Sequence, residues 1–415
     1  MKRLLLILMM GLLTMSVSGQ TDRLPDADPD VVAGNTGFAF DLYQALPKSD
    51  DGNLLFSPYS ISQAFAMAYA GAEGVTEDEM ADVLNISLPE DEFHPAFARL
   101  NLNLTEREYD EFFTEGEAST FQLNIANAVW AQQGYPFAPA FVDTLDAFYG
   151  SGFRDVDFTA DPDGAREAVN DWVAEATEDR ITDILAPGTI DPMTRMVLAN
   201  AIYFNASWMM PFPDALTADA PFTLLDGTEV TVPLMNQSET VLYADGENYQ
   251  AALLPYLGGD MGMVVILPDE GAFNEVDAVL DAEMFAELRD DLGPSGEVNV
   301  YLPRFEYEFD LQLGQIMAGL GMGSAFSALD ADFSGMLAEP TGENLFIGEA
   351  LHKAFIKVDE QGTEAAAATV LTMRATSVMP TEPVTFRVDR PFMFAIIDNQ
   401  TDSVLFLGRV MNPAG

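Results

Sequence analysis

One stretch of this 415-residue chain is the most informative about its fold: Glu360-Gln361-Gly362-Thr363-Glu364-Ala365-Ala366-Ala367-Ala368-Thr369. Four consecutive alanines favour a helix, but strand-like apolar runs at 354–358 and 384–388 flank the stretch. In an extended backbone the small side chains at alternate positions would face one way, namely Thr363, Ala365, Ala367 and Thr369. Glu364, Ala366 and Ala368 would face the other way. The stretch therefore predicts either a surface helix or a strand held in reserve, small enough to enter a sheet without displacing core atoms.

The patterning on either side is that of a mixed α and β chain. Helices are expected where apolar residues recur at helical spacing, at 28–46, at 61–70, from Thr76, where Thr76 and Glu79 have the form of a capping box, and at 165–185. Strands are expected at 121–130, 196–204, 262–267, 298–302, 354–358, 384–388, 392–397 and 404–410. Early helices and late strands indicate one α+β domain built on large sheets.

Short motifs occur along the whole chain around this stretch. They are Phe56-Ser57-Pro58-Tyr59-Ser60-Ile61, Asn170-Asp171-Trp172-Val173 with Thr177, Asn200-Ala201-Ile202-Tyr203-Phe204, Trp208 with Pro211-Phe212, Leu254-Pro255-Tyr256, Leu302-Pro303-Arg304-Phe305, Asp332-Phe333-Ser334-Gly335, His352-Lys353, Arg390-Pro391-Phe392 and Phe406-Leu407-Gly408-Arg409-Val410-Met411-Asn412-Pro413. Each motif is weak alone. In this order, and together with the 360–369 stretch, they resemble the serpin family over nearly all of the mature chain.

This resemblance implies a serpin fold: α+β, with three β-sheets, about nine helices and an exposed reactive loop near the C-terminus, at about 360–383. It also implies a single domain at 20–415. Serpins present the loop as a substrate, and the protease serine forms an acyl-enzyme at the cut bond. The hinge of the loop then enters the main sheet as a new strand and traps the protease. By resemblance the hinge comprises Glu360, Gly362, Thr363, Glu364, Ala365, Ala366, Ala367, Ala368 and Thr369.

The resemblance also assigns residues to the opening of the sheet and to the cut bond. Ser57, Ser60, Asn200 and His352 would lie where the main sheet parts, and Trp208 near the point where insertion begins.

In the family the cut residue lies about fourteen positions after the hinge glycine, which points here to Thr376-Ser377, or to Ala375-Thr376 if the register slips by one. Either bond would suit an elastase-like or subtilisin-like protease. A loop two residues shorter would place the cut at Arg374-Ala375, which would suit a trypsin-like protease.

The N-terminus has the pattern of a targeting segment. Lys2 and Arg3 precede an apolar run at 4–13, and the small residues of Val17-Ser18-Gly19 follow as a cleavage pattern. The run is too short to span a membrane. We therefore expect a signal peptide at 1–19 and a mature chain that is secreted or periplasmic and not inserted in a membrane. The chain has no cysteine, so packing alone must stabilise it.

The charge of the chain excludes several classes of partner. The formal net charge is −49, with 67 acidic residues, and the lysines are Lys2, Lys48, Lys353 and Lys357. This charge repels the phosphates of nucleic acids and the sulfates of glycosaminoglycans, so we expect neither as a partner. The partner that the resemblance implies is a serine protease, held in a covalent acyl complex by a monomeric inhibitor.

No motif in the sequence indicates an enzyme. A Ser-His-Asp triad would need His94 or His352. His94 lies in an acidic stretch and is expected at the surface, whereas His352 lies between apolar residues and is expected to make structural hydrogen bonds. Metal-ligand spacings and phosphate-binding glycine loops are missing from the sequence, so no metal and no cofactor are expected. Two alternatives stay open: a non-inhibitory serpin that acts as a binding protein or chaperone, and a secreted hydrolase.

Overall fold

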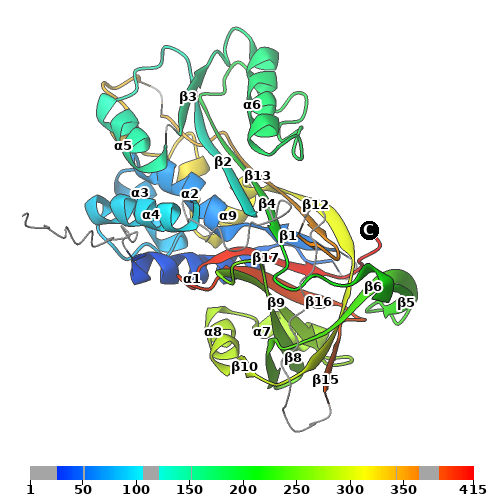
Figure 1. The fold of residues 1–415 in the computed structure, drawn as a ribbon. Helices are drawn as coiled ribbons and strands as arrows, with labels where there is room; N and C mark the ends of the chain where they lie inside the picture. The colour runs from blue at the N-terminus through cyan, green and yellow to red at the C-terminus, as the bar shows by residue number, and fades with distance from the viewer. Residues whose placement is uncertain (1–25, 50–51, 106–120, 151, 343, 364–382) are drawn as a thin grey trace, which may run out of the picture.

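The computed structural model describes residues 26–49, 52–105, 121–150, 152–342, 344–363 and 383–415. Over these ranges the chain forms three β-sheets and nine α-helices, as the resemblance implied (Figure 1). Within the same ranges no helix combines the length and apolarity that crossing a bilayer requires.

The six-stranded sheet contains Gly362 and Thr363 and the two strands that flank them. Its strands are, in spatial order, β12 (Phe305–Gln312), β13 (Glu349–Val358), β14 (Gly362–Thr363), β4 (Met196–Ser207), β2 (Phe121–Gln132) and β3 (Phe153–Val156). Every side chain of β4 is buried, because clusters of apolar residues cover both faces of the sheet at this strand. The unbroken apolar run at 196–204 predicted a strand covered in this way, and the structure confirms it.

Two further sheets complete the β structure. The seven-stranded sheet has the order β1 (Leu54–Phe56), β17 (Val404–Val410), β16 (Phe392–Asp398), β9 (Met261–Pro268), β8 (Tyr249–Pro255), β7 (Leu242–Gly246) and β10 (Gly293–Pro294). The four-stranded sheet has the order β15 (Val384–Arg387), β11 (Val298–Pro303), β6 (Glu229–Glu239) and β5 (Ala218–Thr223). All the strands expected from the sequence are present within a few residues of their expected ends.

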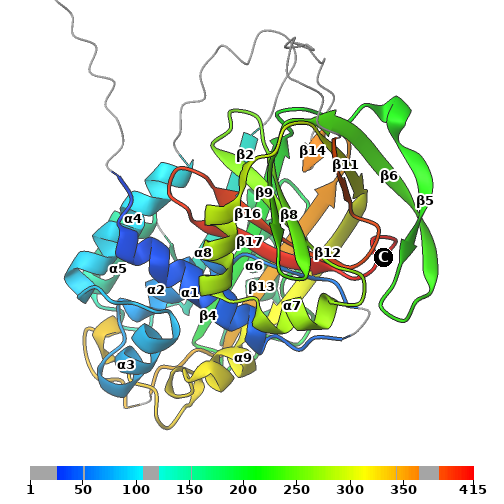
Figure 2. The same ribbon diagram turned by 90° about the horizontal axis from the view of Figure 1, so that it is seen from below.

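The helices group mainly at one end of the molecule, opposite β5 and β6 (Figure 2). They are α1 (Pro29–Ala45), α2 (Pro58–Tyr69), α3 (Gly74–Val83), α4 (Glu90–Thr105), α5 (Pro139–Tyr149), α6 (Pro162–Ala176), α7 (Phe273–Val279), α8 (Ala282–Asp291) and α9 (Leu313–Leu320). Helix α2 is buried along its whole length and contacts β2, β4 and β17. Ser57 caps this helix, since its hydroxyl accepts the N–H of Ser60 at 3.1 Å.

Two of the expected helix boundaries are wrong. The helix expected at 165–185 ends at Ala176, because Glu178 and Asp179 adopt positive φ angles of 53° and 60° that end helical winding.

Helix α3 begins at Gly74, before Thr76, so Thr76 and Glu79 form no capping box. The Thr76 hydroxyl instead accepts the N–H of Asp332 at 2.9 Å, and the Glu79 carboxylate accepts the N–H of Ser324 at 2.8 Å. These two side chains therefore hold a distant segment against α3.

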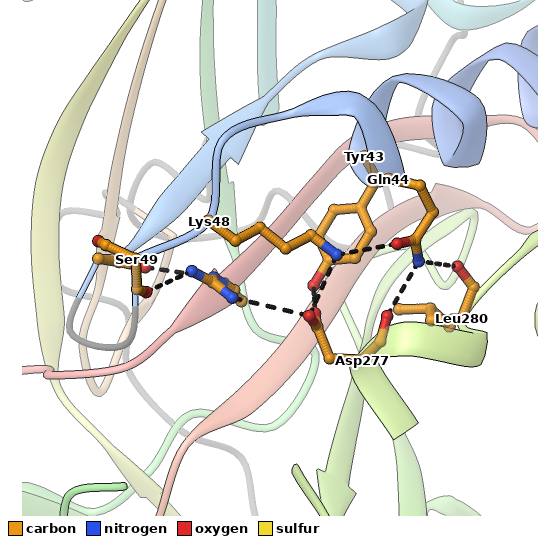
Figure 3. Close-up of polar contacts among 8 residues, drawn as sticks. Tyr43, Gln44, Lys48, Ser49, Asp277 and Leu280 are labelled. Carbon is orange, nitrogen blue, oxygen red and sulfur yellow. Dashed lines mark hydrogen bonds and ion pairs between the residues drawn. The ribbon is translucent and has the colours of Figure 1, made fainter. Parts of the chain in front are cut away.

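A buried charge cluster joins the N-terminal helix to the last strand of the fold (Figure 3). The Asp277 carboxylate of α7 accepts hydrogen bonds from the Tyr43 hydroxyl and, at 3.1 Å, from the Lys48 ammonium. A guanidinium nitrogen of Arg409, on β17, lies 3.7 Å from the same carboxylate. Two cations of a strongly acidic chain thus share one buried anion, which offsets the loss of their hydration.

The same cluster also fastens the connection between α1 and β1. Arg409 donates to the backbone carbonyls of Ser49 at 2.6 Å and Gly52 at 3.2 Å. The Gln44 amide donates to the carbonyls of Asp277 at 2.9 Å and Leu280 at 2.8 Å. Arg409 belongs to the C-terminal motif, so the structure gives that motif residue a packing role.

Replacing Asp277 by Asn should lower the free energy of unfolding by about 3–5 kcal/mol, because Arg409 and Lys48 would lose their buried counter-charge. The midpoint of urea unfolding measures this loss. Asp146→Asn is the matched control, because it makes the same change of charge at an exposed position of α5. Equal midpoints for the two variants would contradict a structural role for the cluster.

Candidate functional site

Strands β13 and β4 pair with each other at one end of the six-stranded sheet and separate at the other. Glu349 to Ala354 of β13 pair in parallel with Val197 to Ile202 of β4. Beyond this point β14 lies between the two strands, and Thr363 pairs with both Val358 and Ala206. The first residues of the hinge therefore already form the beginning of an antiparallel strand inside the sheet.

Glu360, at the start of the hinge, is a buried residue fixed by an ion pair with the half-exposed Arg304. Its side chain is 4% exposed, and its carboxylate accepts hydrogen bonds from both Nε (2.9 Å) and Nη2 of Arg304. The Thr217 hydroxyl donates to the same oxygen. Burial alone would raise the pKa of the Glu360 carboxyl, but the hydrogen bonds from Arg304 and Thr217 outweigh burial and hold this pKa below its usual value. The root of the hinge is thus held by an ionised carboxylate.

The surroundings of Gly362 leave no room for a side chain, whereas those of Thr363 hold a buried hydroxyl. A Cβ atom on Gly362 would lie 2.1 Å from the carbonyl oxygen of Ala206, so no other residue fits between the strands here. The side chain of Thr363 is buried, and its hydroxyl forms a hydrogen bond of 2.7 Å with the Tyr256 hydroxyl. The first inward-facing hinge residue is therefore seated in the core with its polar atom satisfied.

Trp208 directly follows Ser207, which pairs with Gly362 of β14. Its ring stacks on that of Tyr256 with 4.6 Å between centroids and 5° between planes. Its indole N–H donates to the carbonyl of Asp359 at 3.0 Å, and its backbone N–H donates to the carbonyl of Gln361 at 2.8 Å. Trp208 thus hydrogen-bonds to Asp359 and Gln361 through its side chain and its backbone, respectively.

A buried polar network lies where β13 and β4 pair directly. Asn200 of β4 donates to the carbonyl (2.6 Å) and the hydroxyl (2.7 Å) of Ser60, at the start of α2. Its side-chain oxygen contacts Nδ1 of His352 on β13, and Nε2 of His352 accepts the N–H of Ser57 at 3.1 Å. Asn127 of β2 joins the network by donating to the carbonyl of Ser60 at 3.0 Å. Ser57 and Ser60, at the start of α2, therefore hydrogen-bond to both β13 and β4.

The hydrogen bonds define the proton position on His352. A backbone N–H can only donate, so Nε2 must be the unprotonated acceptor and Nδ1 must donate to Asn200. Burial lowers the pKa of His352 to about 3, which keeps the ring neutral. As expected from the sequence, His352 makes structural hydrogen bonds.

Comparison with known proteins places this arrangement in a family. The model of the family Serpin (serine protease inhibitor) matches residues 33–413. The chain belongs to the serpin family. This family of protease inhibitors implies a protease as the partner.

Relatives match along most of their length. This serpin is 39% identical over 384 residues to an uncharacterized serpin-like protein of Thermococcus kodakarensis, covering 92% of this chain and 86% of the relative. It is 37% identical over 390 residues to the leukocyte elastase inhibitor of Sus scrofa, covering 92% and 99% of the two chains. The native state of the thermophilic serpin tengpin matches it with a TM-score of 0.79 and 30% identity, covering 94% of this chain and 96% of that one.

Part of the site expected from the sequence is brought together and part lies elsewhere. Ser57, Ser60, Asn200 and His352 form one network, and Trp208 lies at the entry of β14. The expected cut bond, with Thr376 and Ser377 and the alternatives Ala375 and Arg374, lies outside the described residues, as do Glu364, Ala365, Ala366, Ala367, Ala368 and Thr369 of the hinge.

Several partners in this serpin's site were not identified from the sequence. Arg304 and Tyr256 lie inside the motifs Leu302-Pro303-Arg304-Phe305 and Leu254-Pro255-Tyr256, which could have indicated them. Thr217 and Asn127 lie in no motif, and only the three-dimensional pairing of the chain reveals their roles.

The expectation that His94 lies at the surface is wrong. The side chain is buried, and Nδ1 lies 2.7 Å from the Tyr149 hydroxyl. Glu90, Asp91 and Glu92, which made the stretch look exposed, do lie in solvent, but helical periodicity turns His94 inward among aromatic rings. Burial lowers the pKa of His94 to about 4.

Replacing Glu360 by Gln should loosen the root of the hinge and lower the free energy of unfolding by about 1–2 kcal/mol, because a charge-assisted hydrogen-bond pair is lost. Since the folded-state pKa of Glu360 is depressed, its contribution is complete above the ordinary value of 4.5 and disappears as the pH falls through the folded-state pKa. The unfolding midpoint at pH 7 and pH 3.5 measures both effects. Glu306→Gln, exposed on β12, is the control; similar losses in both variants at pH 7 would refute the specific role of Glu360.

Acidification should destabilise this serpin partly through His94. The folded-state pKa of about 4 lies below the ordinary 6.5, so the stabilisation is complete above pH 6.5 and is lost as the pH falls towards 4. Between pH 6.5 and 5 the loss amounts to about 2 kcal/mol. His94→Gln should flatten the dependence of the unfolding midpoint on pH in this range. An unchanged slope in the variant would contradict the buried, neutral state of His94.

Proposed function

We propose that this serpin inhibits serine proteases by covalent trapping, in which the cut loop enters the six-stranded sheet between β13 and β4. The observation that carries this proposal is β14 itself, since Gly362 and Thr363 already occupy the position and direction of an inserted strand. The protease serine would attack the cut bond and form an acyl-enzyme. Further insertion would then carry the bound protease away before hydrolysis ends the reaction.

The existing pairing indicates how far the hinge must travel. If the antiparallel pairing of Thr363 continues along the chain, Thr369 falls opposite both Asn200 and His352. At present these two residues pair with each other across β4 and β13. Insertion of the hinge to Thr369 would therefore have to break the contact between Asn200 and His352, which is consistent with their proposed place at the opening of the sheet.

The side chains of the hinge support inhibition over a non-inhibitory role. Thr363 is buried, and in a strand the positions on the same face are Ala365, Ala367 and Thr369. All are small, so the core need not be displaced on insertion. A charged side chain at one of these positions would cost several kcal/mol to bury and would slow insertion.

The target is proposed to be an elastase-like or subtilisin-like protease cut at Thr376-Ser377. The small residues at this bond support the proposal, as does similarity to the leukocyte elastase inhibitors of Sus scrofa and Homo sapiens. The alternative is a trypsin-like protease that cuts the loop at Arg374-Ala375.

From the pattern of residues 1–19 we further propose that the mature inhibitor is secreted or periplasmic, and that it acts as a monomer.

Thr363→Arg should convert the inhibitor into a substrate. The guanidinium would have to be buried where the Thr363 hydroxyl now meets Tyr256, so insertion would slow and hydrolysis would release active protease. The experiment incubates parent and variant with elastase, subtilisin and trypsin and follows them by denaturing gel electrophoresis. Thr231→Arg, at an exposed position of β6, is the matched control and should still inhibit.

A denaturant-resistant band near the summed masses is expected for the parent and the control, and only cleaved chain for Thr363→Arg. The mass of the released C-terminal peptide identifies the cut bond and so separates the two classes of target. Cleavage of the parent by all three proteases, with no stable complex and no rise in thermal stability afterwards, would favour the non-inhibitory alternative. Stable complexes with Thr363→Arg would refute insertion.

A further inference from the structure

Strand β2 extends well beyond the strand that covers its outer edge. β3 pairs only with Val129 to Gln132 at the end of β2, whereas β4 pairs with β2 along nearly its whole length. On the side of β3, no other strand in the described part of the chain pairs with β2. Within the described part of the chain, this side of β2 is therefore an unpaired edge from Gln122 to Ala128, and an unpaired edge offers main-chain N–H and C=O groups to another chain.

A cleft of about 460 Å³ follows this open edge from Leu123 to Asn127. Residues near the C-terminal ends of α4, α5 and α6 form its other walls, and the three helices lie around β2 and β3 (Figure 1). Its lining includes the side-chain amides of Gln63, Asn101, Asn124 and Asn127. The amides of Gln63, Asn101 and Asn127 hydrogen-bond to one another. Asn124 makes no side-chain hydrogen bond within the described part of the chain, and its amide can both donate to and accept from a peptide main chain.

The charge of the lining differs from that of the rest of the molecule. Although 67 of the 415 residues are acidic, no acidic residue in the described part of the chain lines the cleft. Arg154 is the one cation among the described residues of the lining, and its guanidinium lies over the rings of Trp172 at 4.8 Å and Trp130 at 5.6 Å. No carboxylate among the described residues forms an ion pair with Arg154. The aromatic rings hold this cation in place while leaving it open to an anionic group.

We propose that this cleft binds an extended peptide that carries an acidic side chain. The peptide would add to the open edge of β2 as a further strand, with its main chain paired to that of β2 and to the Asn124 amide. Its carboxylate would pair with Arg154. This site is separate from the gap between β13 and β4 and goes beyond the proposed inhibition of proteases.

The open edge favours a peptide over a small anion. The five residues from Leu123 to Asn127 span roughly 16 Å at strand spacing, and four of them line the cleft. A small anion would contact Arg154 alone and would leave the edge unused. The ligand class that uses both features is an extended chain.

The test measures binding of three synthetic pentapeptides by calorimetry at 0.15 M salt. The first is acetyl-Thr-Val-Glu-Val-Thr-amide, the second has Gln in place of Glu, and the third is the first with alternate backbone nitrogens methylated. We expect the Glu peptide to bind about tenfold more tightly than the Gln peptide, because only the former pairs with Arg154. The methylated peptide should not bind, because it cannot complete the strand ladder.

Two variants separate the contribution of Arg154 from that of the edge. Arg154→Gln should remove the tenfold preference for Glu while the Gln peptide still binds. Arg99→Gln is the matched control, because Arg99 lies on α4 in a 3.6 Å ion pair with Asp28 and outside the cleft lining; it should keep the preference.

Several results would overturn the proposal. They are equal binding of the methylated peptide, a preference for Glu that survives in Arg154→Gln, and absence of binding at millimolar peptide. Pairing of two copies of the chain through this edge, seen as a dimer in light scattering, would also overturn it. No protease is present in the test, so its outcome is independent of whether the protein inhibits one.

Discussion

The division of β13 and β4 into a paired half and an open half is the constraint on which the rest of the structure depends. Where the strands pair, Asn200 and His352 are satisfied by each other and by Ser60 and Ser57 of α2. Where they separate, Gly362 and Thr363 fill the space. Buried polar groups are costly when unpaired, so the paired half resists opening until other partners replace these contacts. A continuing hinge strand would supply main-chain partners of that kind.

Ion pairs also stabilise the arrangement of strands around the gap between β13 and β4. With a net charge of −49, general repulsion works against the compact state and is weakened by salt. Several of the few cations in the described part of the chain join separate elements. Lys353 of β13 pairs with Glu308 (2.9 Å) and Asp310 (3.4 Å) of β12, and Arg304 holds Glu360. The strands on one side of the gap are thus tied to each other and to the root of the hinge.

Local pattern and motif order predicted much of the fold, and contact between distant segments explains what they missed. The unbroken apolar run at 196–204 indicated a strand covered on both faces, and β4 is one. The end of α6 depends on the positive φ angles of Glu178 and Asp179. The sequence does not predict these angles, because acidic residues also occur within helices. The prediction that His94 is exposed is wrong because it follows from the acidic neighbours, whereas the position of the His94 ring depends on where α5 packs. In the site, Arg304 and Tyr256 lay in recognisable motifs, but Thr217 reaches Glu360 only through the folded chain.

On the proposed mechanism, the alanines of the hinge suit a strand that is added to the sheet after cleavage. Alanine has low strand propensity and high helix propensity, so its side chains contribute little to pairing within a sheet. Its small volume means that entry meets little steric resistance once β13 and β4 part. Glycine at 362 extends the same principle to the backbone, since the carbonyl of Ala206 leaves no room for a Cβ atom. On the proposed mechanism, main-chain pairing therefore drives insertion, and the side chains are chosen so as not to oppose it.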